Sequence, residues 1–255
     1  MKKSLFGFAA ASIIALSAAA HAAPKEVRIG TEAAYAPFEF VDPSGKIVGF
    51  EVELGDAICA AAELKCVWSN VPFDALIPQL MEKKIDGIMS SMSITEKRRK
   101  SIDFTSKYFQ VPNAFVAKKG TTIELTKEGL KGKKVGVQSG TTNADYLKKY
   151  FDGVVEVVRY QTQEEVNMDL VNGRLDAMVV DSVIGTEWFK TEQGKNFALA
   201  SPMLKDPVFG EGVGVGLRKG ETELKAAFEK GVSKVLADGT AQKLSLKWFG
   251  VDIYK

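Results

Sequence analysis

The chain has 255 residues, with 34 lysine and arginine residues, 32 aspartate and glutamate residues and one histidine. Residues 1–22 carry two of the lysines and His21, so cleavage after Ala22 would leave equal numbers of basic and acidic residues and no imidazole. A neutral chain lacks the positive field of a nucleic-acid binder, and a chain without histidine lacks the base of Ser-His-Asp and Cys-His enzymes. We therefore expect no nucleic-acid partner.

The first 22 residues have the pattern of a secretory signal peptide. Two lysines precede an uncharged apolar run from Leu5 to Ala20, and the residues Ala20, His21 and Ala22 fit the small-x-small cleavage site. A retained membrane anchor is the alternative, but the apolar run is short for a membrane-spanning helix. We expect export and cleavage after Ala22. The remaining length allows one large domain or two small ones.

Strand-like and helix-like stretches alternate along the next part of the chain. Residues 27–30 form a predicted strand, and Phe50, Leu54 and Ile58 recur at the spacing of an amphipathic helix. The next predicted elements are a strand at 66–68, a helix at 73–83 and a strand at 87–89. This βαβαβ order predicts an α/β layer with a mostly parallel sheet.

The same order recurs further along. The predicted elements are strands at 134–137, 154–160 and 176–180 and helices at 143–150 and 164–172. The segments QLMEKKIDGIMS (79–90) and DLVNGRLDAMVV (169–180) also share a pattern of leucine, basic residue, aliphatic residue and aspartate. The repetition predicts two similar lobes. Two further helices are predicted at 221–237 and 240–249.

Three other features have competing interpretations. Cys59 and Cys66 are the two cysteines, and an even count in an exported chain favours one disulfide over two free thiols. Glycine at every second position from Gly210 to Gly216 lacks the GxGxxG spacing, and indicates a strand with close backbone approach or a crossing between lobes. The stretch MSSMSITEKRRKSIDFT (89–105) could be a helix start at Ser93, a basic patch or a solvated surface.

No catalytic motif accompanies these elements. The sequence has no GxSxG, S-x-x-K, GxxxxGK[ST] or HExxH pattern, and nothing singles out a pair among its scattered carboxylates. We therefore predict neither an enzyme nor a cofactor or metal site.

Seven motifs resemble the periplasmic amino-acid-binding proteins of ABC importers, most of all the lysine/arginine/ornithine- and histidine-binding group. They are IGTEAAYAPFEF (29–40), GFEVEL (49–54), FDALIPQL (73–80), SSMSITEKR (90–98), LKGKKVGVQSGT (130–141), GRLDA (173–177) and FGEGVGVGLRK (209–219). The positions of the two cysteines match that group's disulfide as well.

The resemblance implies a type II periplasmic-binding-protein fold, with two α/β lobes joined by a two-strand hinge. Lobe 1 would comprise residues 23–111 and 211–255, lobe 2 residues 112–210, and the hinge would lie near 110–114 and 205–213. The protein would be a periplasmic monomer. It would deliver a free basic amino acid to the transmembrane subunits of an ABC importer.

The resemblance also implies how the common part of an amino acid is bound. Arg98 would bind the α-carboxylate through its two-pronged guanidinium, helped by the backbone N–H groups of Ser93 and Thr142, each expected at a helix N-terminus. Asp181 would pair with the α-ammonium. The carbonyl of Ser91 and the hydroxyl of Ser93 would assist it.

A second set of residues would bind the ligand's side chain. Tyr35 and Phe73 match the aromatic pair that encloses its stem, and Glu32 matches the acidic position that receives a cation. Ser90, Thr141, Asn143 and the carbonyl of Gln138 would surround that cation. Glu32 stands where aspartate is usual and Asn143 where glutamine is usual, which leaves the ligand's length open. Arginine ranks first, then lysine and ornithine, then histidine. The alternatives are an opine derived from arginine, or a dehydratase-type enzyme on the same fold.

Overall fold

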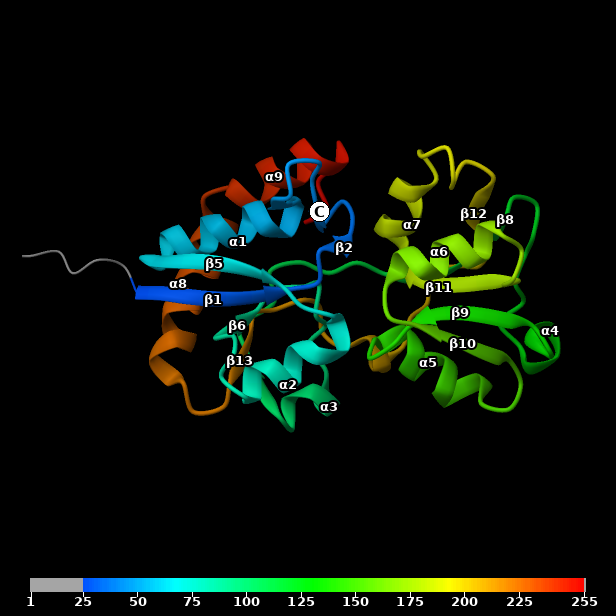
Figure 1. Ribbon diagram of the computed structural model, residues 1–255, viewed down its shortest axis with the longest axis horizontal. Helices are drawn as coiled ribbons and strands as arrows, with labels where there is room; N and C mark the ends of the chain where they lie inside the picture. Colours follow the sequence, from blue (N-terminus) through cyan, green and yellow to red (C-terminus); the bar gives the residue numbers. More distant parts are fainter. Residues whose placement is uncertain (1–24, 255) are drawn as a thin grey trace, which may run out of the picture.

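The computed structural model describes residues 25–254 and shows two α/β lobes side by side (Figure 1). The predicted signal peptide and its cleavage site lie outside these residues. The first lobe contains a five-stranded sheet in the order β5 (Leu64–Asn70), β1 (Lys25–Thr31), β6 (Gly87–Ile88), β13 (Gly216–Arg218) and β7 (Ile102–Phe104). The second contains the order β10 (Glu156–Tyr160), β9 (Lys134–Gln138), β11 (Ala177–Asp181), β8 (Asn113–Lys118) and β12 (Phe197–Leu199).

Each sheet has one strand that runs against the other four. β1, β5 and β6 pair in parallel, and β13 pairs antiparallel with both β6 and β7. In the second sheet β8 has the same place, antiparallel to both β11 and β12. The mostly parallel α/β architecture predicted for both lobes is therefore confirmed. Each of these two strands directly follows a crossing between the lobes. β8 is the first strand after the chain enters the second lobe, and β13 is the first after it returns to the first lobe.

Helices cover both faces of each sheet. Of the first sheet, one face packs against α1 (Phe50–Ala61), α8 (Thr222–Ala237) and α9 (Thr240–Phe249), and the other against η1 (Phe73–Ala75), α2 (Leu76–Met81) and α3 (Glu96–Arg99). The second sheet lies between α6 (Gln163–Val171) with α7 (Ser182–Trp188) and α4 (Lys127–Leu130) with α5 (Thr142–Phe151). Phe50, Leu54 and Ile58, which predicted α1, are fully buried. Their apolar face drives the helix onto the sheet.

The two crossing segments lie antiparallel to each other between the lobes. Val213 N–H donates to the carbonyl of Phe109 at 2.9 Å, and Leu204 N–H to that of Asn113 at 2.7 Å. Gly212 has φ of +123°, and a Cβ there would lie 2.8 Å from the carbonyl oxygen of Phe109. Glycine is needed at this crossing because the two backbones approach closely. The short 3-10 helix η2 (Pro207–Phe209) precedes it.

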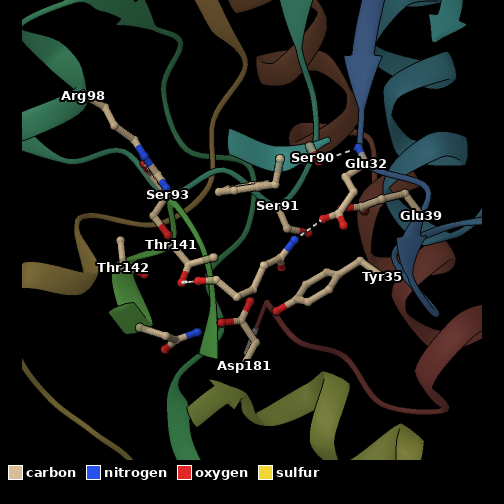
Figure 2. A pocket seen from close by; sticks show the side chains of 13 residues that line it. Glu32, Tyr35, Glu39, Ser90, Ser91, Ser93, Arg98, Thr141, Thr142 and Asp181 are labelled. Carbon is tan, nitrogen blue, oxygen red and sulfur yellow. Dashed lines mark hydrogen bonds between the residues drawn. The ribbon is translucent and has the colours of Figure 1, made fainter. Parts of the chain in front are cut away.

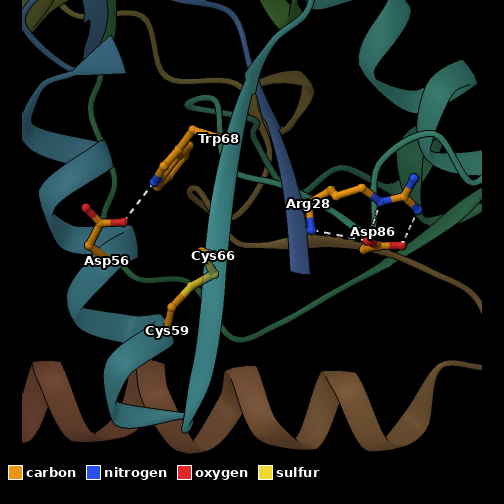
Figure 3. The surroundings of a disulfide bond; sticks show 6 residues. All are labelled: Arg28, Asp56, Cys59, Cys66, Trp68 and Asp86. Carbon is orange, nitrogen blue, oxygen red and sulfur yellow. Dashed lines mark hydrogen bonds and ion pairs between the residues drawn. A yellow bond between two sulfur atoms is a disulfide. The ribbon is translucent and has the colours of Figure 1, made fainter. Parts of the chain in front are cut away.

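The aspartate of the repeated pattern has the same structural role in both lobes. Asp86 Oδ2 accepts the backbone N–H of Arg28 at 3.1 Å, while its own N–H donates to the Arg28 carbonyl at 2.7 Å (Figure 3). Asp176 Oδ2 accepts the N–H of Lys134 at 2.7 Å, and its N–H donates to the Lys134 carbonyl at 2.9 Å. Each aspartate thereby fixes a turn against the neighbouring strand. The sequence repeat thus corresponds to a structural repeat.

Cys59 of α1 and Cys66 of β5 form the predicted disulfide, with 6.1 Å between their Cα atoms (Figure 3). Trp68 Nε1 also donates to Asp56 Oδ1 at 2.8 Å between the same helix and strand. These contacts fasten the end of α1 to the edge strand of the first sheet. Among residues 25–254, no helix combines the length and the apolar character needed to cross a membrane.

A small sheet near the cleft was not predicted. It consists of β2 (Ala34–Tyr35), β3 (Glu39–Val41) and β4 (Ile47–Val48) in that order. Its strands are two or three residues long, too short for an alternating pattern to be detected. It positions Tyr35 and Glu39 against the cavity between the lobes.

Candidate functional site

A cavity lies between the lobes, and all twelve residues expected to bind a ligand line it (Figure 2). The first lobe contributes Glu32, Tyr35, Phe73, Ser90, Ser91, Ser93 and Arg98, and the second contributes Gln138, Thr141, Thr142, Asn143 and Asp181. A thirteenth lining residue, Glu39, was not predicted from the sequence. The structure therefore brings the whole predicted set together around one space.

The strand order explains why residues so far apart in sequence meet. Glu32 directly follows β1 and Ser90 lies just beyond β6, while Gln138 and Asp181 are the last residues of β9 and β11. These are the carboxyl ends of the parallel strands in both sheets, where open α/β folds place their ligands. The two lobes face each other through these ends.

Arg98 is a buried cation without a carboxylate partner in the described part of the chain. Its side chain donates from Nη1 to the Ser93 carbonyl at 2.8 Å and from Nη2 to the Gly140 carbonyl of the other lobe at 3.0 Å. Its guanidinium carbon lies 5.5 Å from the centre of the Phe73 ring. Burial lowers the pKa of Arg98 to about 10, so the group stays charged at neutral pH. It can therefore attract an anion to this end of the cavity.

Asp181 and Tyr35 meet across the cleft. The Tyr35 hydroxyl points toward the Asp181 carboxyl (Figure 2), and the two groups interact closely enough to shift each other's pKa. Burial raises the pKa of Asp181 to about 7, against the lowering effects of the Tyr35 hydrogen bond and the Arg98 charge. A ligand ammonium placed beside Asp181 would reverse that shift, because an opposite charge favours the carboxylate.

Glu32 lies at the opposite end, and its position is fixed from both lobes. Its backbone N–H donates to the Ser90 hydroxyl at 2.9 Å, and its Oε2 accepts from Gln138 Nε2 at 2.6 Å. Burial raises the pKa of Glu32 to about 7, and the hydrogen bond from Gln138 opposes the rise. No donor of the described residues reaches its other oxygen, Oε1.

Two more buried oxygens around the cavity lack a donor among residues 25–254. They are Glu39 Oε2 and Asn143 Oδ1, in side chains that are 1% and 6% exposed. Burying an acceptor without a donor costs about 1–3 kcal/mol. With Glu32 Oε1 they make an acceptor-rich cavity, which favours a ligand group with several N–H donors.

The prediction of a helix N-terminus is confirmed at Thr142 and wrong at Ser93. Thr142 is the first residue of α5, and the Thr141 hydroxyl caps that helix by accepting the Ala144 N–H at 3.3 Å. α3 begins only at Glu96 with Thr95 as its cap, and Ser93 forms an isolated bridge with Val213 of the crossing segment. The Ser-x-x-Glu pattern at 93–96 was misleading, because Ser93 pairs with backbone from a distant part of the chain.

Two α/β lobes with a polar cavity between their strand ends define a two-lobed ligand-binding protein. Residues 27–251 match the family of bacterial extracellular solute-binding proteins, family 3, and the chain belongs to that family. It is 46% identical to the L-arginine-binding protein of Pseudomonas aeruginosa over 100% of this chain and 99% of the relative. It is 43% identical to the lysine/arginine/ornithine-binding periplasmic protein of Escherichia coli, with the same coverage. A solved Salmonella typhimurium periplasmic binding protein with high arginine specificity has a TM-score of 0.82 at 33% identity, over 88% of this chain and 99% of that one.

Proposed function

We propose that this protein captures a basic L-amino acid in the periplasm, arginine before lysine, ornithine and histidine, and delivers it to the transmembrane subunits of an ABC importer. The observation that carries the proposal is the cavity's charge arrangement. Arg98 lies at one end without a carboxylate partner within residues 25–254, and Glu32 at the other has an oxygen that no described donor reaches. The twelve predicted residues are the proposed binding set.

The Arg98 end suits the part common to all amino acids. Arg98 uses two of its five N–H donors on carbonyls, which leaves donors for an α-carboxylate. The N-terminal turn of α5 at Thr142 offers backbone N–H groups to the same anion. Asp181 pairs with the α-ammonium, with the Ser91 carbonyl and the Ser93 hydroxyl as its neighbours. Neither ligand charge is then buried unpaired.

The Glu32 end selects the ligand's side chain. Tyr35 and Phe73 enclose the aliphatic stem, and Glu32, Gln138 and Asn143 present oxygens to the terminal cation. A guanidinium has five N–H donors in a fixed plane and an ammonium has three on a flexible stem. Several separate acceptors therefore fit arginine better than lysine or ornithine. Both of the reported relatives carry arginine in their names.

Two alternatives remain to be separated from this function. An opine derived from arginine would keep the guanidinium but needs room for a second carboxylate near Asp181. A dehydratase on the same fold is a different class, and it would have to act with carboxyl groups, because the described residues contain no histidine. The cavity pairs both charges of a free amino acid, which supports binding without turnover.

Calorimetry with a panel of ligands tests the proposal. The panel comprises arginine, lysine, ornithine, histidine, citrulline, glutamine, glutamate and an arginine-derived opine. We expect the tightest binding by arginine, no binding of glutamate, and recovery of arginine unchanged after incubation. Turnover of a bound ligand, or no binding by any basic amino acid, contradicts the proposed function.

A further inference from the structure

Two buried carboxyl groups meet beside the Glu32 end of the cavity. Glu39 lies in β3 and Glu51 in the first turn of α1, with exposed fractions of 1% and 0%. The two carboxyl groups interact directly, and the charge of Glu51 raises the pKa of Glu39. Two buried carboxylates side by side repel each other, so the pair keeps one proton.

The surrounding hydrogen bonds show which partner keeps the negative charge. Glu51 Oε2 accepts the N–H and the hydroxyl of Ser91 at 2.6 Å and 2.8 Å, and its Oε1 accepts the hydroxyl of Tyr108. Three donors therefore stabilise a carboxylate at Glu51. Glu39 is the partner that holds the proton, and burial together with the Glu51 charge raises the pKa of Glu39 well above its ordinary range.

No protein cation balances this pair within residues 25–254. The ionisable groups with the strongest electrostatic effect between themselves and the pair are Glu32, Tyr35, Tyr108, Asp181 and Tyr254. All of them are acidic, and no lysine or arginine of the described chain forms a salt bridge with either glutamate. A cation that enters the cavity from outside is the missing counter-charge.

We propose that Glu39 is a second specificity-determining residue for the ligand's side-chain cation, and that this cation replaces the proton shared by Glu39 and Glu51. The proposal rests on the proposed function. On binding, the O–H bond of Glu39 breaks, its proton passes to solvent, and the carboxylate pairs with the ligand. One positive charge replaces another, so the pocket gains no net charge. The planar guanidinium of arginine reaches both Glu32 and Glu39, which separates it from uncharged analogues.

Proton release measured by calorimetry tests this step. L-Arginine is titrated at pH 8 in phosphate and in Tris, whose ionisation enthalpies differ, so that the difference in heat counts the protons released. Glu32 and Asp181, with pKa values of about 7, are mostly ionised at that pH and contribute little. We expect the wild type to release about one proton more than Glu39→Gln does. Glu82→Gln, which removes an exposed charge next to Lys84, is the matched control and should behave as the wild type.

Selectivity gives a second measurement. Glu39→Gln should lower the ratio of arginine to citrulline affinity by about tenfold or more, because a charged hydrogen bond is lost only with the cationic ligand. If the variant binds arginine with unchanged proton release and selectivity, the inference is wrong and the proposed function stands. If the wild type binds no basic amino acid, both fail. If Glu39→Gln does not fold, the wild type alone decides, since binding without proton release at pH 8 overturns the inference.

Discussion

Gln138 of the second lobe donates a hydrogen bond to Glu32 of the first, with 2.6 Å between Nε2 and Oε2. The same Nε2 also donates to the carbonyl of Gln161 at 2.9 Å, so the amide is held from its own lobe. Within the described residues 25–254, further contacts between the lobes around the cavity are Arg98 to the Gly140 carbonyl, Tyr35 to Asp181, and Lys97 to Asp145 at 2.9 Å. Three of the four involve residues proposed to bind the ligand. Ligand recognition and lobe closure therefore depend on the same side chains.

Replacing Glu32 by glutamine should change which ligands bind best. The amide keeps an acceptor for Gln138 but loses the negative charge, so arginine and lysine should bind about 10–100-fold more weakly. Citrulline and glutamine should be affected much less. Calorimetry with these four ligands measures the change, and Glu96→Gln, on the exposed surface of α3, is the control. An equal loss for all four ligands would falsify the role of Glu32 as a side-chain reader.

Replacing Arg98 by alanine should weaken every ligand alike. The α-carboxylate would then be buried without its cation, which costs about 2–5 kcal/mol of binding free energy. Arg99→Ala is a matched control, because Arg99 is half-buried and pairs with Glu211 outside the cavity. Affinities for arginine, lysine and histidine should fall together in the first variant and stay unchanged in the second. A loss confined to one ligand would assign Arg98 to side-chain selection instead.

The sequence predicted the helices and inner strands because their apolar residues recur with a clear period. Phe50, Leu54 and Ile58 marked α1, and runs such as 134–137 marked central strands that are buried on both faces. The small β2–β3–β4 sheet was missed because its strands are too short to show a period. The lobe and hinge boundaries stay a prediction.

The candidate site was predicted from motifs, and Glu39 is the lining residue that this prediction missed. Glu39 belongs to the quoted motif IGTEAAYAPFEF (29–40), yet nothing in its neighbours indicates that it faces a cavity. That position results from β3 pairing with β2 and from the contact with Glu51 of α1. Ser93 shows the same limit, since its partner Val213 lies 120 positions away. A local sequence pattern predicts local structure. Contacts between segments that are distant in sequence become visible only once the fold is known.

Removing the disulfide should destabilise the first lobe without altering the site. Cys59 and Cys66 are seven positions apart, and closing so short a loop in the unfolded chain is worth about 2–3 kcal/mol. Cys59→Ser with Cys66→Ser should therefore lower the free energy of unfolding by about that amount. Denaturant titration measures the loss. Arginine affinity should stay the same, because neither cysteine lines the cavity. A loss of affinity in the folded variant would show that α1 transmits strain to Glu51 and Ser91.

Arginine binding should weaken in acid because Glu32 and Asp181, in addition to Glu39, must be ionised to pair with its cations. Burial raises the pKa values of Glu32 and Asp181 to about 7 in the unliganded protein, and a bound cation lowers them again. Below pH 7 both groups take up protons that binding must displace, so the dissociation constant should rise by up to about tenfold per pH unit for each group.

Stability of the unliganded protein should have the opposite pH dependence. A carboxyl whose folded pKa lies above its unfolded value contributes stability below the unfolded pKa, and that contribution is lost as pH rises through about 7. The increase in melting temperature caused by arginine should therefore be larger at pH 8 than at pH 5.5. Thermal melts with and without arginine at the two pH values measure the difference, and Asp181→Asn should reduce it. An increase that is equal at both pH values would mean that neither carboxyl changes its protonation when the ligand binds.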